Sequence, residues 1–251
     1  MIRTSSVTKS YGETLVVDGV SLDLPTGGVT AIIGPNGAGK STLLGMISRL
    51  LPMDAGSTTV DGLDVTRTPG DQLARRLAIL RQDNHIAARL TVGDLVAFGR
   101  YPHTKGRLTV EDRQIIADSI AWLNLEDLTG RFLDELSGGQ RQRAFIAMVL
   151  AQQTDYVLLD EPLNSLDLKH AVGIMRLLRR ASRELGKTIV VVLHDINFAA
   201  AWSDHIVCMK QGRVARHGPP ASIITSESLT DIYEVDISVH ELDGRLVSIC
   251  N

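Results

Sequence analysis

A glycine-rich motif near the start of the chain has the composition and spacing of a phosphate-binding loop. Eight residues fit the pattern G-x-x-x-x-G-K-[ST], namely Gly34, Pro35, Asn36, Gly37, Ala38, Gly39, Lys40 and Ser41, and Thr42 follows them in the predicted site. Glycines let backbone N–H groups converge on an anion, and the helix that follows adds the positive end of its dipole. The motif therefore predicts a bound nucleoside triphosphate, with Lys40 at the β- and γ-phosphates and the Ser41 hydroxyl on Mg²⁺.

Two adjacent carboxylates, Asp160 and Glu161, follow an apolar run. The run, residues 156–159, has the composition of a buried strand, and Pro162 stops its ladder of hydrogen bonds. Because side chains alternate along a strand, we expect the two carboxylates to point in different directions. Asp160 is then suited to holding Mg²⁺, and Glu161 to acting as general base on the water that attacks the γ-phosphate.

The stretch Leu136-Ser137-Gly138-Gly139-Gln140 predicts a second helix start that faces a ligand. Ser137 and Gln140 have the spacing of a capping box. The two glycines each weaken a helix by about 1 kcal/mol, which makes sense if bare N–H groups must approach a ligand closely.

A further apolar run, residues 188–193, ends at His194. Such runs suit parallel strands buried on both faces, and open α/β sheets bind ligands at the carboxyl ends of their strands. We therefore expect His194 in the site. We expect the other histidines to be structural, namely His85, His103, His170, His205, His217 and His240.

With these motifs in this order, the chain resembles the ATP-binding-cassette (ABC) ATPases, the motor subunits of membrane transporters. The stretch at residues 136–140 matches that family's signature letter for letter. The resemblance implies ATP and Mg²⁺ as ligands. It also implies a homodimer in which the signature of one copy closes over the ATP held by the phosphate loop of the other.

The resemblance also assigns further residues to the site. Tyr11 corresponds to the aromatic residue that stacks on adenine, Gln82 to the glutamine that contacts Mg²⁺ and the attacking water, and His194 to the γ-phosphate switch. Residues 165–167 match the loop that crosses to the other subunit, although Leu166 stands where the family often has alanine.

Length and resemblance together predict the architecture. At 251 residues and 44% hydrophobic, the chain can bury one sizeable core. We expect an α/β ABC ATPase fold, a phosphate-loop RecA-like mixed sheet with an antiparallel β subdomain and an inserted helical subdomain. The expected single domain, residues 1–251, divides into a core of residues 1–84 and 155–251 and a helical subdomain of residues 85–154.

The inserted segment carries two helix signals and one basic stretch. Thr91 with Asp94 and Thr109 with Asp112 have the spacing of acidic capping boxes. The basic residues 100–107 are expected to form a solvated loop.

Near the carboxyl end, Asp243-Gly244 predicts a tight hairpin turn between two strands. Cys208 lies in an apolar strand pattern and is expected to be reduced and buried.

Charge and hydropathy restrict the partners. A net charge of −3 argues against a nucleic-acid binder. The sequence has neither the layout of a secretory leader at its start nor an apolar run near the ~20 residues of a membrane span. We therefore expect a peripheral protein on the cytoplasmic face of the membrane. The resemblance implies transmembrane permease subunits as its partners and an extracytoplasmic substrate-binding protein as an indirect one.

Residues 90–103 are similar to subunits that serve iron–siderophore and vitamin B12 uptake. The resemblance thus implies an ATPase that powers import of an iron–siderophore complex. Two alternatives stay open: an importer of vitamin B12, haem or another solute, and a non-transport ABC protein that uses ATP-driven dimerisation. Fused exporters carry their own membrane spans, a feature for which the sequence gives no signal.

Overall fold

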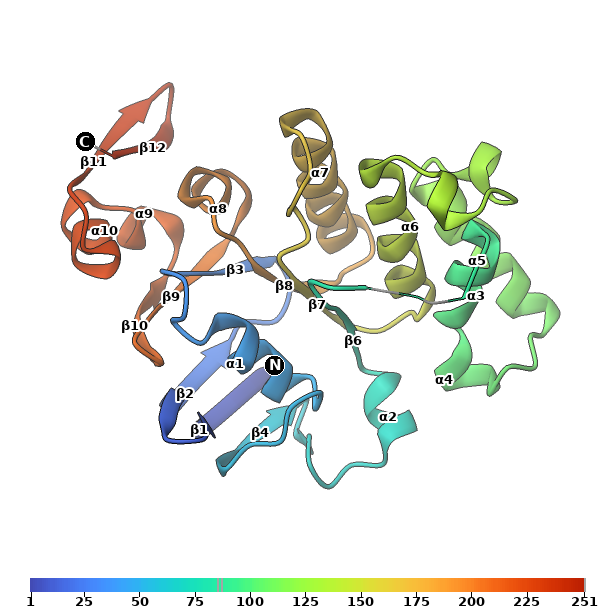
Figure 1. The fold of residues 1–251 in the computed structure, drawn as a ribbon, viewed down its shortest axis with the longest axis horizontal. Coiled ribbons are helices and arrows are strands. Elements are labelled where there is room, and N and C mark those ends of the chain that lie inside the picture. Colours follow the sequence, from blue (N-terminus) through green and yellow to red (C-terminus); the bar gives the residue numbers. More distant parts are fainter. Residues whose placement is uncertain (85, 87, 251) are drawn as a thin grey trace.

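The computed structural model describes residues 1–84, 86 and 88–250, so His85 lies outside the described residues. Its centre is a six-stranded sheet beside a four-stranded antiparallel sheet (Figure 1). The larger sheet has the order β10 (Arg213–Gly218), β9 (His205–Lys210), β3 (Val29–Ile33), β8 (Thr188–Val192), β7 (Tyr156–Asp160) and β6 (Leu77–Leu80). The smaller has the order β2 (Thr14–Leu24), β1 (Ile2–Tyr11), β4 (Ala55–Val60) and β5 (Leu63–Asp64). Only β10 runs antiparallel to its neighbour in the larger sheet, so the other five strand ends share one edge.

The larger sheet is buried on both faces, as its continuous apolar strands predict. One face packs on α1 (Lys40–Ile47) and the antiparallel sheet, while the other packs on α6 (Gly138–Ala151), α7 (Leu168–Glu184) and α8 (Ile196–Trp202). Strand β3 shows the alternation, since Ile32 joins the first core and Ala31 and Ile33 join the second. The phosphate-loop helix is thus fixed between two sheets.

A helical region separates β6 from β7 in the sequence and lies to one side of the sheets (Figure 1). It contains α3 (Val92–Phe98), α4 (Tyr101–Thr104), α5 (Val110–Trp122) and α6. Both predicted capping boxes are confirmed, with Asp94 closing the box of Thr91 and Asp112 that of Thr109. The other α-helices are α2 (Gly70–Ala74), α9 (Pro220–Ile223) and α10 (Ser226–Tyr233), and two short 3₁₀ helices, η1 (Glu126–Leu128) and η2 (Leu133–Glu135), lie between α5 and α6. No helix in the described part of the chain combines the length and the apolar character that crossing a membrane requires.

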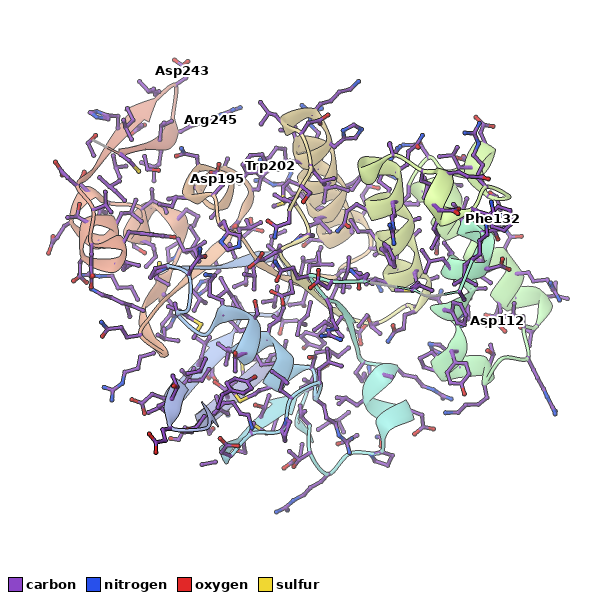
Figure 2. The ribbon with its side chains drawn as sticks, viewed as in Figure 1. Asp112, Phe132, Asp195, Trp202, Asp243 and Arg245 are labelled. Atoms are coloured by element: carbon purple, nitrogen blue, oxygen red, sulfur yellow. The ribbon has the colours of Figure 1, made fainter. Side chains whose placement is uncertain are left out.

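The prediction of a solvated basic loop at residues 100–107 is wrong over its first five residues, because Tyr101–Thr104 form α4 and Arg100 before them is buried. Arg100 is only 5% exposed, and it holds three segments together. Its Nε donates to Asp112 Oδ1 at 2.9 Å, and its Nη1 donates to the carbonyl oxygen of Ala151 at 2.8 Å, at the end of α6. Figure 2 shows Asp112 within the helical region. Hydrogen bonds from Thr109, with help from Arg100, lower the pKa of Asp112 to about 2.

The last part of the chain folds as predicted. Strands β11 (Ile237–Leu242) and β12 (Arg245–Cys250) form a hairpin, and its turn residues Asp243 and Gly244 both have positive φ, 50° and 72°. Figure 2 shows Asp243 at the tip. Cys208 is buried in β9, and burial raises the pKa of its thiol to about 12, so the expected reduced, buried state is confirmed. Strand β8 ends at Val192, one residue before the end of the predicted apolar run.

Candidate active site

The phosphate loop follows β3, a strand near the middle of the larger sheet. Gly34 and Gly39 have φ values of 143° and 91°. A Cβ on Gly34 would lie 2.1 Å from the carbonyl oxygen of Met209, and one on Gly39 would lie 2.5 Å from that of Val16. Only glycine therefore fits both positions. Gly39 is the N-cap of α1, and no side chain of the described residues caps this helix, so its first N–H groups are free for an anion.

Lys40 is buried at the start of α1, with only 5% of its surface exposed. Its Nζ donates to the carbonyl oxygens of Gly34 and Pro35, both at 2.9 Å. Burial lowers the pKa of this lysine, against the opposing effect of Glu161 and Asp160. Within the described residues no carboxylate lies at ion-pair distance from the ammonium group, and a phosphate would supply the missing negative charge.

Ser41 and Asp160 meet at the edge of the sheet. The Ser41 hydroxyl donates to Asp160 Oδ1 at 2.8 Å. Burial raises the pKa of Asp160, against the opposing effect of the hydrogen bond from Ser41. Both residues line a cavity of about 410 Å³ together with Tyr11 and Gln82. This set of oxygen donors fits Mg²⁺, which at phosphate sites usually takes one or two carboxylates and otherwise water and phosphate oxygens.

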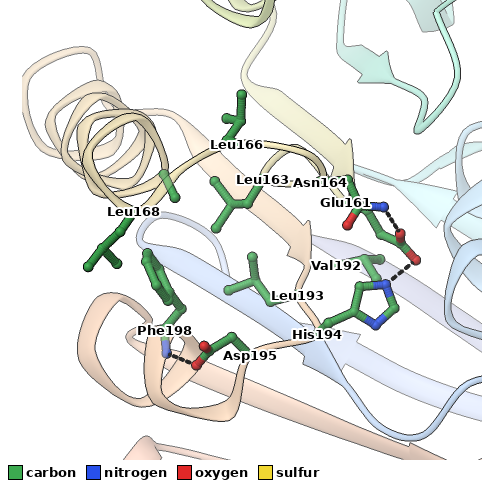
Figure 3. Close-up of a pocket in the computed structure, with 11 residues that line it drawn as sticks. Glu161, Leu163, Asn164, Leu166, Leu168, Val192, Leu193, His194, Asp195 and Phe198 are labelled. Atoms are coloured by element: carbon green, nitrogen blue, oxygen red, sulfur yellow. Dashed lines mark hydrogen bonds and ion pairs between the residues drawn. The ribbon is translucent and has the colours of Figure 1, made fainter. Parts of the chain in front are cut away.

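Glu161 and His194 touch each other, a contact that the sequence did not predict (Figure 3). Glu161 Oε1 lies 2.6 Å from His194 Nε2, and Glu161 Oε2 accepts from Asn164 Nδ2 at 2.6 Å. The Glu161 side chain is 9% exposed, against 42% for His194. The signal for this contact is topological, because β7 and β8 are parallel neighbours with Asp160 paired to Val192, so the residues that follow them must meet.

The two carboxylates do face different partners, but strand alternation is the wrong reason. Strand β7 ends at Asp160, and Glu161 has a left-handed φ of 48°. The change of direction therefore comes from a turn that begins at Glu161. The cavity beside it, of about 310 Å³, is lined by both Glu161 and His194 and otherwise largely by apolar side chains such as Phe198 (Figure 3).

The signature stretch starts α6 as predicted, with a complete capping box. The Ser137 hydroxyl accepts the N–H of Gln140, and the Gln140 side chain accepts the N–H of Ser137 at 2.9 Å. Within one chain this helix start lies apart from α1, on the far side of the larger sheet (Figure 1). Gln82 also lines a groove of about 460 Å³ with Gly138, so it borders the Ser41 cavity on one side and the signature on the other.

The reason predicted for the paired glycines is incomplete. A Cβ on Gly139 would lie 2.2 Å from the ring of His170, so a side chain there would have to displace that ring, and packing within the chain is itself a reason for glycine. Around Gly138 the nearest neighbour of such a Cβ is Leu166 Cδ2 at 3.9 Å, an ordinary contact. Only Gly138 is left with close ligand approach as its reason.

Comparison with known proteins identifies the family. The ABC transporter family model matches residues 17–164. The chain belongs to the ABC transporter family. The predicted family, fold class and ATPase activity are therefore confirmed, and ATP is the nucleotide of this family.

Three relatives match almost the whole chain. The petrobactin import ATP-binding protein YclP of Bacillus subtilis (strain 168) is 49% identical over 249 residues, which cover 99% of each chain. The petrobactin import ATP-binding protein FatE of Bacillus anthracis is 52% identical over 239 residues, 95% of this chain and 96% of that one. The hemin import ATP-binding protein HmuV of Thermobifida fusca (strain YX) is 41% identical over 240 residues, 95% and 84%.

Two solved structures share the fold. One is an ABC transporter in an inward-facing conformation, with a TM-score of 0.85 and 25% identity, covering 100% of this chain and 96% of that one. The other is the dimeric post-hydrolysis state of the ATP-binding cassette MJ0796 bound to ADP and Pi. Its TM-score is 0.77 at 31% identity, with 88% and 99% of the two chains covered.

Proposed function

We propose that this chain is the ATP-hydrolysing subunit of an importer that carries an iron–siderophore complex through partner transmembrane permease subunits. The similarity to two petrobactin import ATP-binding proteins, at 49% and 52% identity over nearly the whole chain, carries the proposal. In this role the chain is peripheral to the cytoplasmic face of the membrane. An extracytoplasmic binding protein delivers the cargo to the permease and contacts this chain only indirectly.

The proposed ATP site uses the start of α1. Its free N–H groups and Lys40 bind the β- and γ-phosphates, and Tyr11, which is 49% exposed, stacks on adenine. Ser41 and Asp160 hold Mg²⁺, with Gln82 at the border of the same cavity. When bound, Mg²⁺ neutralises charge that develops on the phosphate oxygens.

Glu161 is the proposed general base. Its carboxylate takes a proton from the water that attacks the γ-phosphate, while the Asn164 amide holds the other carboxylate oxygen. His194 holds the carboxylate through Nε2 and has a second ring nitrogen that can face the γ-phosphate. The contact of 2.6 Å makes the orientation of the base depend on the histidine.

A second copy completes the proposed site. The dimeric cassette bound to ADP and Pi supports this arrangement, as does the separation of the two helix starts within one chain. In the proposed homodimer the signature of one copy, Ser137, Gly138, Gly139 and Gln140, closes over the ATP on the other. Residues 85–154 act as the helical subdomain and contact the permease, using exposed apolar side chains such as Phe98 and Tyr101.

Uptake measurements in a deletion strain test the cargo. Cells without this chain should grow normally when iron is plentiful and fail when a chelator makes siderophore uptake limiting. They should still bind labelled ferric siderophore outside the membrane but accumulate none. The wild-type chain should restore accumulation and the Glu161→Gln form should not, because transport needs repeated ATP hydrolysis to reset the dimer.

Haem is the second candidate cargo, favoured by the 41% identity to a hemin import ATP-binding protein. Parallel uptake assays with labelled haem and cobalamin separate the cargoes. Unchanged siderophore uptake together with lost haem or cobalamin uptake would contradict the proposed cargo and leave the ATPase assignment intact.

A further inference from the structure

The first turn of α6 rests on the imidazole ring of His170, a residue on α7. A Cβ on Gly139 would lie 2.2 Å from Cδ2 and 2.6 Å from Cγ of His170, so the ring fills the space that a side chain at residue 139 would need. Gly139 is buried, whereas Ser137 and Gly138 are exposed. The Cβ direction at residue 139 therefore points into the protein, and the exposed side of the turn is free for a ligand.

The ring of His170 is held by the carboxylate that caps its own helix. Asp167 Oδ1 accepts the backbone N–H of His170 at 2.8 Å and lies 2.7 Å from His170 Nδ1. Asp167 is also the N-cap of α7. These hydrogen bonds lower the pKa of Asp167, so its carboxylate is charged at neutral pH.

A short turn connects the Asp167–His170 pair to Glu161. The N–H of Asn164 donates to the carbonyl oxygen of Glu161 at 3.2 Å, and the N–H of Leu166 donates to that of Leu163 at 3.2 Å. Asn164 Nδ2 also holds the Glu161 carboxylate at 2.6 Å. Two hydrogen-bonded turns of the continuous chain thus lead from Glu161 to Asp167, and the His170 ring connects Asp167 to Gly139.

We propose that His170 is a positioning residue for the signature motif. Clamped by Asp167, its ring sets the height and tilt of the α6 N-terminus and so aims the exposed N–H of Gly138 and the hydroxyl of Ser137. The inference rests on the proposed composite site, in which Glu161 serves one nucleotide and the signature of the same chain serves the other. His170 then joins the base of one ATP site to the part of this chain that completes the second.

A double-mutant cycle with Gly139→Ala and His170→Ala, in the full-length chain, tests the contact. We expect His170→Ala to lower kcat roughly 10- to 100-fold, the scale of a misplaced catalytic group, with unchanged affinity of the Lys40 site for a fluorescent ATP analogue. Gly139→Ala alone should lower kcat similarly, because its methyl group displaces the ring. In the His170→Ala background the space is empty, so Gly139→Ala should add little further loss. Equal losses from Gly139→Ala in both backgrounds would overturn the proposal, because independent sites are additive.

His170→Phe keeps the experiment informative if His170→Ala does not fold. Phenylalanine keeps a ring under Gly139 and should retain a kcat several-fold above that of His170→Ala, whereas equal activity of the two variants would overturn the proposal. Gly173→Ala is the matched control on α7, since nothing lies within 4 Å of its Cβ, and it should leave kcat unchanged.

A separate variant distinguishes this inference from the proposed function. Ser137→Arg should abolish hydrolysis if the signature completes the site. Normal activity in Ser137→Arg would contradict the proposal that the signature of a second copy completes the ATP site. Lost activity in Ser137→Arg together with normal kcat in His170→Ala would overturn only the positioning role.

Discussion

The two helix starts assigned to the nucleotide, at α1 and at α6, are built in opposite ways. The first has a left-handed glycine at its N-cap, no side-chain cap among the described residues, and the buried Lys40 as its first residue. The second has a complete capping box between Ser137 and Gln140, and its first two residues, Ser137 and Gly138, are exposed. An uncapped helix start leaves its first N–H groups to an outside acceptor, whereas the capping box of α6 satisfies those of Ser137 and Gln140 and itself leaves those of Gly138 and Gly139.

The two helix starts are suited to different tasks, since one can bind ATP and the other can complete the ATP site of a second copy. The α1 start lies between two sheets and gains most from an anion, so it suits primary binding of ATP. The α6 start is stable without a ligand and lies at the surface, so it suits closure over a nucleotide that another copy holds. Variants that affect one side and leave the other intact test this division.

The largest expected effect is in catalysis on the α1 side. Glu161→Gln should lower ATP turnover by roughly a hundred- to ten-thousand-fold, the usual range for removing a general base, while nucleotide binding persists. Steady-state hydrolysis and equilibrium binding of a fluorescent ATP analogue measure the two quantities. Turnover within a few-fold of wild type would show that another group acts as the base.

Alanine at matched glycines should separate the two starts. Gly39→Ala places a side chain on a backbone with a left-handed φ of 91°, which costs about 1–2 kcal/mol. The added Cβ would also lie 2.5 Å from the carbonyl oxygen of Val16. ATP affinity should therefore fall by about tenfold or more. Gly138→Ala meets only Leu166 at 3.9 Å and should leave ATP binding unchanged, as isothermal titration can measure. A similar loss of ATP affinity in both variants would contradict the assignment of ATP binding to the α1 start alone.

Removing a cap should have a smaller effect on folding. Ser137→Ala should lower the free energy of unfolding by about 1 kcal/mol, as should the control Thr91→Ala at the cap of α3. Only Ser137→Ala should also lower ATPase activity, because only that hydroxyl belongs to the proposed site. Urea unfolding and steady-state hydrolysis give both readouts, and equal activity of the two variants would count against a ligand role for Ser137.

The smallest expected effect is an acid dependence of the helical region, where Arg100 joins Asp112 to the end of α6. The pKa of Asp112 is lowered from 3.8 to about 2 in the folded chain. Its stabilising contribution is therefore present above the unfolded pKa and is lost as the pH falls through the folded one. As the pH falls from 3.8 to about 2, the melting temperature should decline more steeply in the wild type than in Asp112→Asn. Identical slopes would show that the ionised carboxylate does not stabilise this region.

Sequence patterns predicted the features that depend on residues close together in the chain. The three capping boxes join residues three apart, and the hairpin turn depends on two adjacent residues, so local composition specifies them. Strands β7 and β8 begin at the first residues of the predicted apolar runs, because those runs start sharply.

Contacts between distant segments were not predictable in this way. Arg100 reaches the carbonyl oxygen of Ala151, 51 residues away, and its burial has no local signal. The position of the His170 ring under Gly139 depends on how α6 and α7 pack. The sequence explained the glycine pair by ligand approach alone and gave no sign of this packing contact. The left-handed turn at Glu161 was not predicted, because strand alternation by itself already predicted that Asp160 and Glu161 point in different directions.

The central claim is that the two helix starts of one chain serve different nucleotides. Mixing Lys40→Ala protein with Ser137→Arg protein tests it most directly, because only a heterodimer contains one intact pair of α1 and α6 starts. Each variant alone should be inactive, with ATP binding lost in the first and kept in the second, and the mixture should recover part of the ATPase activity. Full activity of Ser137→Arg protein alone, at concentrations where it is monomeric, would contradict the account.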